Sequence, residues 1–161
     1  MPSVSAIREL PAVASQVIPA RWEDQNGHIN VRFYMSLYNY SGWPMLDLVG
    51  VDERYFKERK MGLVDLDNHL RYISELHVGE RVTAYGRFLA HDRKRIQGMI
   101  FVVNDDRDVL ACIIEFLSIN FDLQKRRSAE IPADIAARLT AITNEHQRLG
   151  WHVDTCKTLA D

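Results

Sequence analysis

The chain has 161 residues, about the length of one domain, and 47% hydrophobic with 26% charged residues is typical of a globular protein. Its formal net charge of −2 creates no positive field, so neither nucleic acid nor an anionic membrane surface is expected as a partner. The N-terminus shows no signal-peptide pattern and no stretch approaches the ~20 apolar residues of a membrane span, so we expect a cytoplasmic protein. Cys112 and Cys156 lack metal-ligand spacing and are expected to be reduced thiols.

The first half of the chain predicts one strand and one enclosed helix. Alternating residues within 12–22 predict a short strand that leads into a polar turn at 24–30. Over residues 31–49 apolar side chains recur at helical spacing and cover most of the circumference, so this helix must be buried. Pro44 lacks an N–H donor, which predicts a kink or break there and a short second helix that ends at Gly50.

The second half predicts an antiparallel sheet and a further helix. After a polar, flexible stretch, short turns separate runs with β-type composition, as in hairpins. The expected strands are residues 63–76, 81–90, 95–103 and 109–123. One face of the second run is apolar and small, so the helix can pack there, while the other face is expected to be solvated.

A proline near the first helical position and apolar residues on one face predict an amphipathic surface helix over residues 132–149. Residues 150–161 are expected to form a loose tail. Since no repeat or linker divides the chain, residues 1–161 are expected to form a single α+β domain with its core at about 12–125.

The turn before the long helix is the strongest candidate for chemistry. A helix N-terminus presents unpaired N–H groups and a partial positive charge, so a substrate oxygen could bind beside the carboxylate of Asp24. The alternative is structural: Asp24 and Asn30 cap the turn, and Gly27 supplies a positive φ.

The residues Trp22, Asp24, Asn26, Gly27 and His28 form the pattern Trp-x-Asp-x-Asn-Gly-His between the first strand and the helix. This pattern and the order β-α-β-β-β-β resemble the hotdog-fold acyl-CoA thioesterases of the 4-hydroxybenzoyl-CoA thioesterase type. Within that superfamily, the chain is most similar to the betainyl-CoA thioesterases of carnitine breakdown. The resemblance implies a hotdog fold, with a long central helix wrapped by a curved sheet of five to six antiparallel strands.

The resemblance also implies roles for the turn. Asp24, three residues before Gly27, would act on the thioester carbonyl as a nucleophile or as a general base. The N–H of Gly27 or of His28 would stabilise the oxyanion. The His28 side chain would hydrogen-bond the substrate or hold the turn.

The candidate substrate-binding residues are Asn26, Asn30, Tyr34, Asp67, Lys94 and Arg95. Asp67 replaces a glutamate that is usual in the resembling group, and would either complete a site across a dimer interface or pair with Arg71. The two basic residues would meet coenzyme A phosphates or simply be solvated. Aromatic residues near the turn would form a cage for a quaternary ammonium group or belong to the core.

The sequence therefore predicts an acyl-CoA thioesterase for a short- or medium-chain substrate, with a betainyl-type acyl group included. We expect no metal or redox cofactor, and a homodimer or homotetramer with sites at subunit interfaces. Two alternatives stay open. One is a hotdog enoyl-CoA hydratase or dehydratase that uses His28 with Asp24, and the other is a non-catalytic acyl-CoA-binding or ligand-sensing module.

Overall fold

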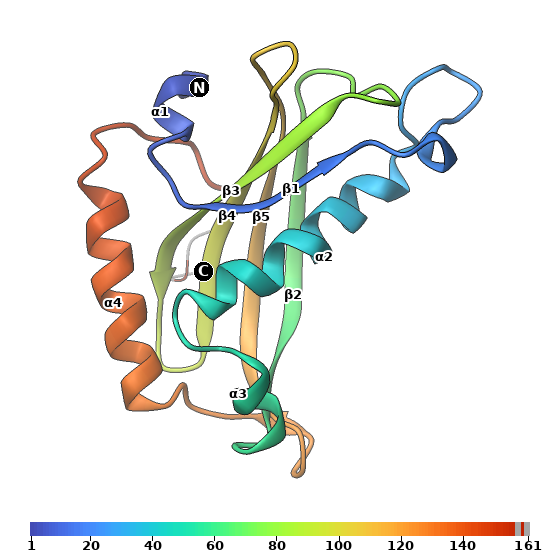
Figure 1. Ribbon diagram of the computed structural model, residues 1–161. Coiled ribbons are helices and arrows are strands. Elements are labelled where there is room, and N and C mark those ends of the chain that lie inside the picture. The colour runs from blue at the N-terminus through green and yellow to red at the C-terminus, as the bar shows by residue number, and fades with distance from the viewer. Residues whose placement is uncertain (157–158, 160–161) are drawn as a thin grey trace.

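The computed structural model describes residues 1–156 and 159 (Figure 1). Four α-helices, one short 3-10 helix and six strands follow one another along these residues. Their bounds are α1 Val4–Ile7, β1 Ala12–Val17, η1 Ala20–Trp22, α2 Arg32–Asp47, α3 Glu53–Lys57, β2 Met61–Tyr72, β3 Arg81–His91, β4 Arg95–Asn104, β5 Val109–Asp122, β6 Arg127–Ser128 and α4 Ala133–Gln147. Among the described residues, no helix is long and apolar enough to span a membrane.

The strands form one antiparallel sheet in the order β1-β3-β4-β5-β2, and the short β6 pairs with the end of β5. The sheet curves around α2, and α4 lies alongside β3 (Figure 1). The expected α+β hotdog architecture is therefore confirmed, including the C-terminal helix. The four long strands were also predicted, although β2 ends at Tyr72 and not at residue 76.

The main core lies between α2 and the concave face of the sheet. From α2, Leu37 and Met45 are buried, and they share one cluster with Val82 and Phe88 of β3. Between these two β3 residues lies Gly86, where a Cβ atom would stand 2.9 Å from the Met45 side chain. Because glycine has no side chain, the helix approaches the sheet closely at this position, as the small apolar face of β3 predicted.

The expected break in the long helix is wrong. The α2 helix runs without interruption from Arg32 to Asp47 with Pro44 inside it, and Gly50 follows with a φ of +84°. Pro44 lies in the last turns of the helix, and the residue whose carbonyl loses its partner is the exposed Tyr40. Water can hydrate that carbonyl, so the proline costs too little to divide a helix that the core holds in place.

The expected flexible stretch after this helix is also wrong. Asp52 caps the short helix α3 by accepting the N–H of Tyr55 at 3.0 Å. The buried Tyr55 hydroxyl donates to Asn120 of β5 at 2.7 Å. Burial is the main cause that raises the pKa of Tyr55 to about 12. One buried aromatic side chain therefore orders a segment whose composition is otherwise polar.

The convex face of the sheet is covered, which corrects two expectations. Residues 150–156, predicted as part of a loose tail, are held against the sheet: Val153 is buried, and the Cys156 N–H donates to the buried Glu115 carboxylate at 2.9 Å. Residues 157–158 and 160–161, which the same prediction included, lie outside the described residues. Arg87, expected to be solvated, is 7% exposed and lies with its guanidinium carbon 4.0 Å from the centre of the Trp151 ring. Sequence periodicity could not identify this cover, because an irregular segment provides it.

Helix α4 closes the free edge of β3 beyond the end of β1. Nδ1 of the buried His146 accepts the N–H of Phe88 at 3.0 Å, a donor that would otherwise point out of the sheet edge. Burial is the main cause that lowers the pKa of His146 below its ordinary 6.5. The folded protein therefore holds this imidazole neutral.

Because His146 is buried in its neutral form, we expect the free energy of unfolding to fall as the pH is lowered. Below pH 6.5 the unfolded chain binds a proton at His146 that the folded chain excludes, so the free energy of unfolding decreases down to the lowered pKa. Urea denaturation at a series of pH values measures this slope. In His146→Asn the amide oxygen can accept the same N–H without titrating, so we expect a shallower slope. A variant with the wild-type slope would contradict the assignment.

Candidate active site

The turn between η1 and α2 is closed by its own backbone. The Asp24 N–H donates to the His28 carbonyl at 3.0 Å, and the Gly27 N–H donates to the Asp24 carbonyl at 3.1 Å. Gly27 has a φ of +79°, in the left-handed region that favours glycine. The Asn30 N–H donates to the Trp22 carbonyl at 2.8 Å. The Trp-x-Asp-x-Asn-Gly-His pattern therefore encodes a compact loop at the start of α2.

The Asp24 carboxylate is held in one orientation. Its Oδ1 accepts the Asn26 N–H at 2.8 Å, and its Oδ2 lies 3.4 Å from the amide nitrogen of Asn30. The side chain is 18% exposed, and Nδ1 of His28 lies 3.9 Å from Oδ1. Asn30 also accepts the Arg32 N–H at 3.2 Å, so it links the carboxylate to the first turn of the helix. Asn26 and Asn30 therefore orient Asp24.

The two candidate oxyanion donors differ in their hydrogen bonding. The Gly27 N–H already donates a hydrogen bond within the turn, whereas the described residues provide no hydrogen-bond acceptor for the His28 N–H. The His28 ring packs next to its own backbone, with Nδ1 3.1 Å from the Ile29 carbonyl oxygen. Of the two N–H groups, that of His28 is the one left available to a substrate oxygen.

A cavity of about 300 Å³ adjoins this turn. His28 and Tyr34 line it from the turn and α2, and Tyr72 and Glu75 line it from the end of β2 and the loop that follows. Tyr34 contacts Tyr72 edge-to-face with ring centres 4.9 Å apart. Burial is the main cause that raises the pKa of the Tyr34 hydroxyl, so this group is protonated at neutral pH. The structure thus brings two predicted site residues, His28 and Tyr34, to one cavity.

A second cavity, of about 200 Å³, lies between α2 and the first half of β2. Its walls include the rings of Tyr38, Trp43 and Phe116, and Asp65 lies at its border. Asp65 accepts a hydrogen bond from the Ser118 hydroxyl at 2.6 Å. Burial, and after it the negative charge of Asp65, raises the pKa of the Tyr38 hydroxyl. The cavity therefore combines aromatic walls with one carboxylate.

Sequence reasoning missed Asp65 because of a bulge. Residues two apart share a strand face, so Asp65 and Asp67 should lie on the same side. The pairing of β2 with β5 instead shifts between them: Asp65 is opposite Ser118, Asp67 is opposite Leu117, and Leu66 is the extra residue. The bulge turns Asp65 toward α2 and leaves Asp67 on the convex face, where it borders a cavity with Glu115.

The remaining predicted substrate-binding residues lie away from Asp24 within one chain. Lys94 lies in the β3–β4 turn and Arg95 is the first residue of β4. This turn is at the opposite end of the sheet from the loop that precedes α2 (Figure 1). Nζ of Lys94 is 3.3 Å from the Ser128 hydroxyl, and Nε of Arg95 is 2.7 Å from the Asp92 carboxylate. Among the described residues, no group of three or more His, Cys, Asp or Glu side chains could hold a metal ion.

Comparison with known proteins places this site in a family. Residues 18–139 match the model of the thioesterase-like superfamily, and this match includes the turn, α2 and the whole sheet except β1. The chain belongs to this superfamily. It is therefore a thioester hydrolase by family.

Two similar proteins are betainyl-CoA thioesterases by name. The betainyl-CoA thioesterase of Pseudomonas aeruginosa is 26% identical over 140 residues, which cover 87% of each chain. An L-carnitine dehydrogenase/betainyl-CoA thioesterase of Rhizobium meliloti is 25% identical over 132 residues, 82% of this chain but 26% of that protein. The chain thus matches one part of this two-activity protein.

Solved structures share the fold. A Staphylococcus aureus protein solved in complex with CoA superimposes with a TM-score of 0.78 at 18% identity, over 91% of this chain and 96% of that chain. The DHNA-CoA thioesterase of the same organism superimposes with a TM-score of 0.73 at 13% identity, over 83% and 93% of the two chains.

The geometry of the turn predicts a specific cost at Gly27. No atom lies within 4 Å of a Cβ added there, so Gly27→Ala meets backbone strain but no clash. The left-handed conformation costs a side chain about 1–2 kcal/mol, and we expect that decrease in the free energy of unfolding, measured by urea denaturation. Asn tolerates this conformation better, so Gly27→Asn should lose less. Equal losses in both variants would contradict the explanation.

Proposed function

We propose that the protein hydrolyses an acyl-CoA thioester with Asp24 as its catalytic carboxylate. The observation that carries this proposal is the oriented Asp24 side chain beside the available His28 N–H at the start of α2. Both groups lie in the closed loop that leads into α2, and an N–H donor held in place by such a loop stabilises a developing oxyanion.

In the proposed reaction the thioester oxygen accepts the His28 N–H, which polarises the carbonyl carbon. Asp24 then either removes a proton from a water molecule that attacks this carbon, or attacks it directly to form an anhydride that water cleaves. In both routes the carbon–sulfur bond breaks and the coenzyme A thiolate leaves and is protonated. A single turnover in ¹⁸O water identifies an anhydride that water cleaves at the Asp24 carbonyl, because Asp24 then gains the solvent oxygen and the product acid takes its oxygen from Asp24. In the general-base route the solvent oxygen appears in the product acid and Asp24 stays unlabelled.

A hydratase function has less support. It requires an imidazole positioned for proton transfer to the substrate. The His28 ring instead has its Nδ1 at 3.1 Å from the Ile29 carbonyl and 3.9 Å from Asp24. The curated relatives named above are thioesterases, which favours hydrolysis as well.

The active form that we propose is a dimer joined through β2. This strand has 12 residues and lies at a free sheet edge, whereas the opposite edge strand β1 has six. Exposed apolar side chains gather along and beside β2: Val64, Leu66, Tyr72 and Ile73. Two β2 strands paired antiparallel about a twofold axis would bury them.

This pairing would complete the site from two chains. The Tyr72 end of β2 adjoins the Asp24 turn, and antiparallel pairing places it opposite the Met61 end of the second copy. The Asp65 cavity of the second copy lies along this Met61 half of its β2 strand. Lys94 and Arg95 lie at the same end of the molecule, so from the second copy they could approach coenzyme A phosphates near Asp24.

The acyl group that fits this arrangement is short and carries a cationic head. The cavity volume of about 200 Å³ is below the usual range for drug-sized ligands, about 300–1,000 Å³. Its rings from Tyr38, Trp43 and Phe116 suit a quaternary ammonium group, and Asp65 supplies a counter-charge. A betainyl group, as in the names of the curated relatives, has this chemistry.

The catalytic assignment predicts that Asp24→Asn lowers kcat by about 100-fold or more, because an amide neither attacks the carbonyl nor takes up a proton. Thiol release from an acyl-CoA panel measures the rate, and thermal unfolding confirms that the variant is folded. Glu23→Gln, which removes the neighbouring exposed carboxylate, is the matched control and should stay within about twofold of the wild type. Wild-type turnover in Asp24→Asn would refute the assignment.

The proposed acyl cavity predicts discrimination between two substrates of the same shape. Betainyl-CoA and 3,3-dimethylbutyryl-CoA differ at one atom, a charged nitrogen in place of a neutral carbon. We expect a higher kcat/KM for betainyl-CoA, and Asp65→Asn should reduce this preference about tenfold, the equivalent of about 1.4 kcal/mol. The neutral substrate should be hydrolysed at a similar rate by both proteins. An unchanged preference would exclude Asp65 as the counter-charge.

A further inference from the structure

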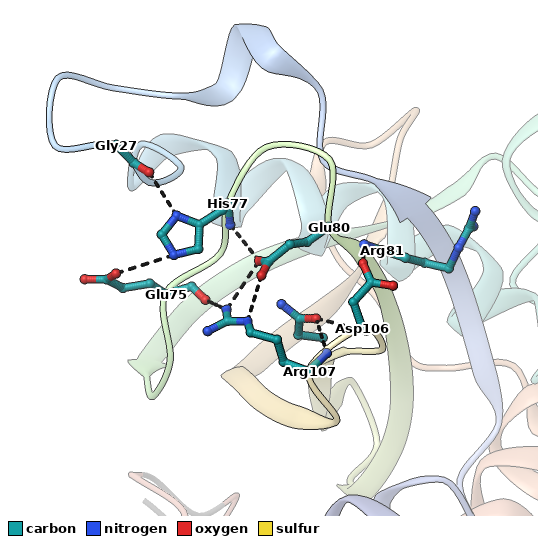
Figure 2. A network of polar contacts seen from close by, with 8 residues as sticks. Gly27, Glu75, His77, Glu80, Arg81, Asp106 and Arg107 are labelled. Carbon is teal, nitrogen blue, oxygen red and sulfur yellow. Dashed lines mark hydrogen bonds and ion pairs between the residues drawn. The ribbon is translucent and has the colours of Figure 1, made fainter.

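The loop between β2 and β3 lies against the Asp24 turn and bonds to it at two places. The Ile29 N–H donates to the Leu76 carbonyl at 2.9 Å, and Nδ1 of His77 lies 2.9 Å from the Gly27 carbonyl oxygen. Figure 2 shows the His77 ring directed at Gly27 from this loop. A carbonyl oxygen can only accept, so the His77 Nδ1 carries the hydrogen of this bond.

The Gly27 carbonyl and the His28 N–H belong to one peptide unit. A trans peptide is planar, so its C=O and N–H groups point in opposite directions. A partner that holds the Gly27 oxygen therefore also sets the direction of the His28 N–H. Hydrogen bonding at the oxygen further polarises the unit and strengthens its N–H as a donor.

We propose that His77 is a positioning residue of this site, whose bond to the Gly27 carbonyl aims the His28 N–H at the thioester oxygen. The inference rests on the proposed function, since it assigns a role within that same site. His77 itself does not touch the reacting atoms. It acts through the Gly27–His28 peptide.

His77 is itself held from the other side by a chain of charged groups (Figure 2). The His77 N–H donates to the Glu80 carboxylate at 2.7 Å, and Nε of Arg107 lies 2.7 Å from the same carboxylate. Arg107 also donates to the Glu75 carbonyl, so it spans the loop. The Glu80 side chain is 15% exposed and that of Arg107 is 38% exposed, so the carboxylate is the better shielded of the two groups. Arg107 belongs to the β4–β5 turn. Through Glu80 and His77, this turn supports the orientation of the Gly27–His28 peptide.

The His77 side chain contributes little packing. It is 44% exposed, and the neighbouring Leu76, which is fully buried, anchors the loop to the core. Nε2 of His77 lies 3.6 Å from the exposed Glu75 carboxylate. Removal of the ring should therefore change the aim of the His28 N–H without unfolding the loop. A loss of activity in a variant that stays folded would therefore indicate a positioning role for His77 and not a structural one.

The experiment compares two side chains of the same shape. In His77→Asn the amide nitrogen replaces Nδ1 as a donor to Gly27, whereas the isosteric His77→Leu has no donor. Loss of a whole oxyanion donor costs about 10²–10³ in kcat, and a misdirected donor should cost about tenfold. We expect that loss in His77→Leu, with KM within twofold, and a rate near wild type in His77→Asn. If His77→Leu does not fold, His77→Gln, whose amide reaches toward Glu75, should show the same loss.

His152→Leu is the matched control. The His152 side chain is 84% exposed, and its Nε2 lies 3.7 Å from the Asp154 carboxylate in the segment after α4, so the kcat of this variant should be unchanged. Wild-type kcat in His77→Leu, or an equal loss in His77→Asn, overturns the inference while the proposed function stands. A wild-type protein that hydrolyses no acyl-CoA overturns both.

Discussion

The structure depends on the burial of one face of α2 against a curved sheet. Met35, Tyr40 and Trp43 of the same helix are exposed, so the expectation of a helix buried around most of its circumference is wrong. Burial of an apolar side chain contributes about 1.5–3 kcal/mol, and α2 supplies several of them, including Leu37 and Met45. The helix can approach closely because Gly86 leaves room for Met45. Once α2 lies in the sheet, its N-terminus must emerge beside the end of β2. The position of the Asp24 turn is therefore a consequence of the core.

The turn shows how backbone hydrogen bonds select a functional group. Closing the loop engages the Asp24 and Gly27 N–H groups, orienting Asp24 engages that of Asn26, and the His28 N–H is left over. An unpaired N–H in a loop costs stability unless water or a ligand satisfies it. Here the cost is small, since the turn is partly exposed. The hydrogen bonds that close and cap this turn therefore leave the His28 N–H as a donor for a substrate oxygen.

The bulge at Leu66 separates two carboxylates that a regular strand would place together. It directs Asp65 to the aromatic cavity beside α2 and Asp67 to the convex face, which the segment after α4 covers. Bulges bend a strand and increase its twist, so the same device shapes the free edge through which we propose that two copies pair. One inserted residue in this way affects both the chemistry of a cavity and the shape of an interface.

The sequence by itself determined the order of the long strands and of the two long helices, and the carboxylate before the first of these helices, because periodicity and turn chemistry are local properties that neighbouring residues express without the rest of the chain. Local patterns could not reveal that α2 continues through Pro44, that Tyr55 orders α3, or that Trp151 covers Arg87, since each depends on contacts between distant segments. The choice between the Gly27 and His28 donors, the face of Asp65 and the approach of His77 to Gly27 were likewise decided by tertiary structure. These three features depend on hydrogen bonds and strand pairing, and the second and third involve residues that are distant in the sequence. Such contacts form only when the chain has folded.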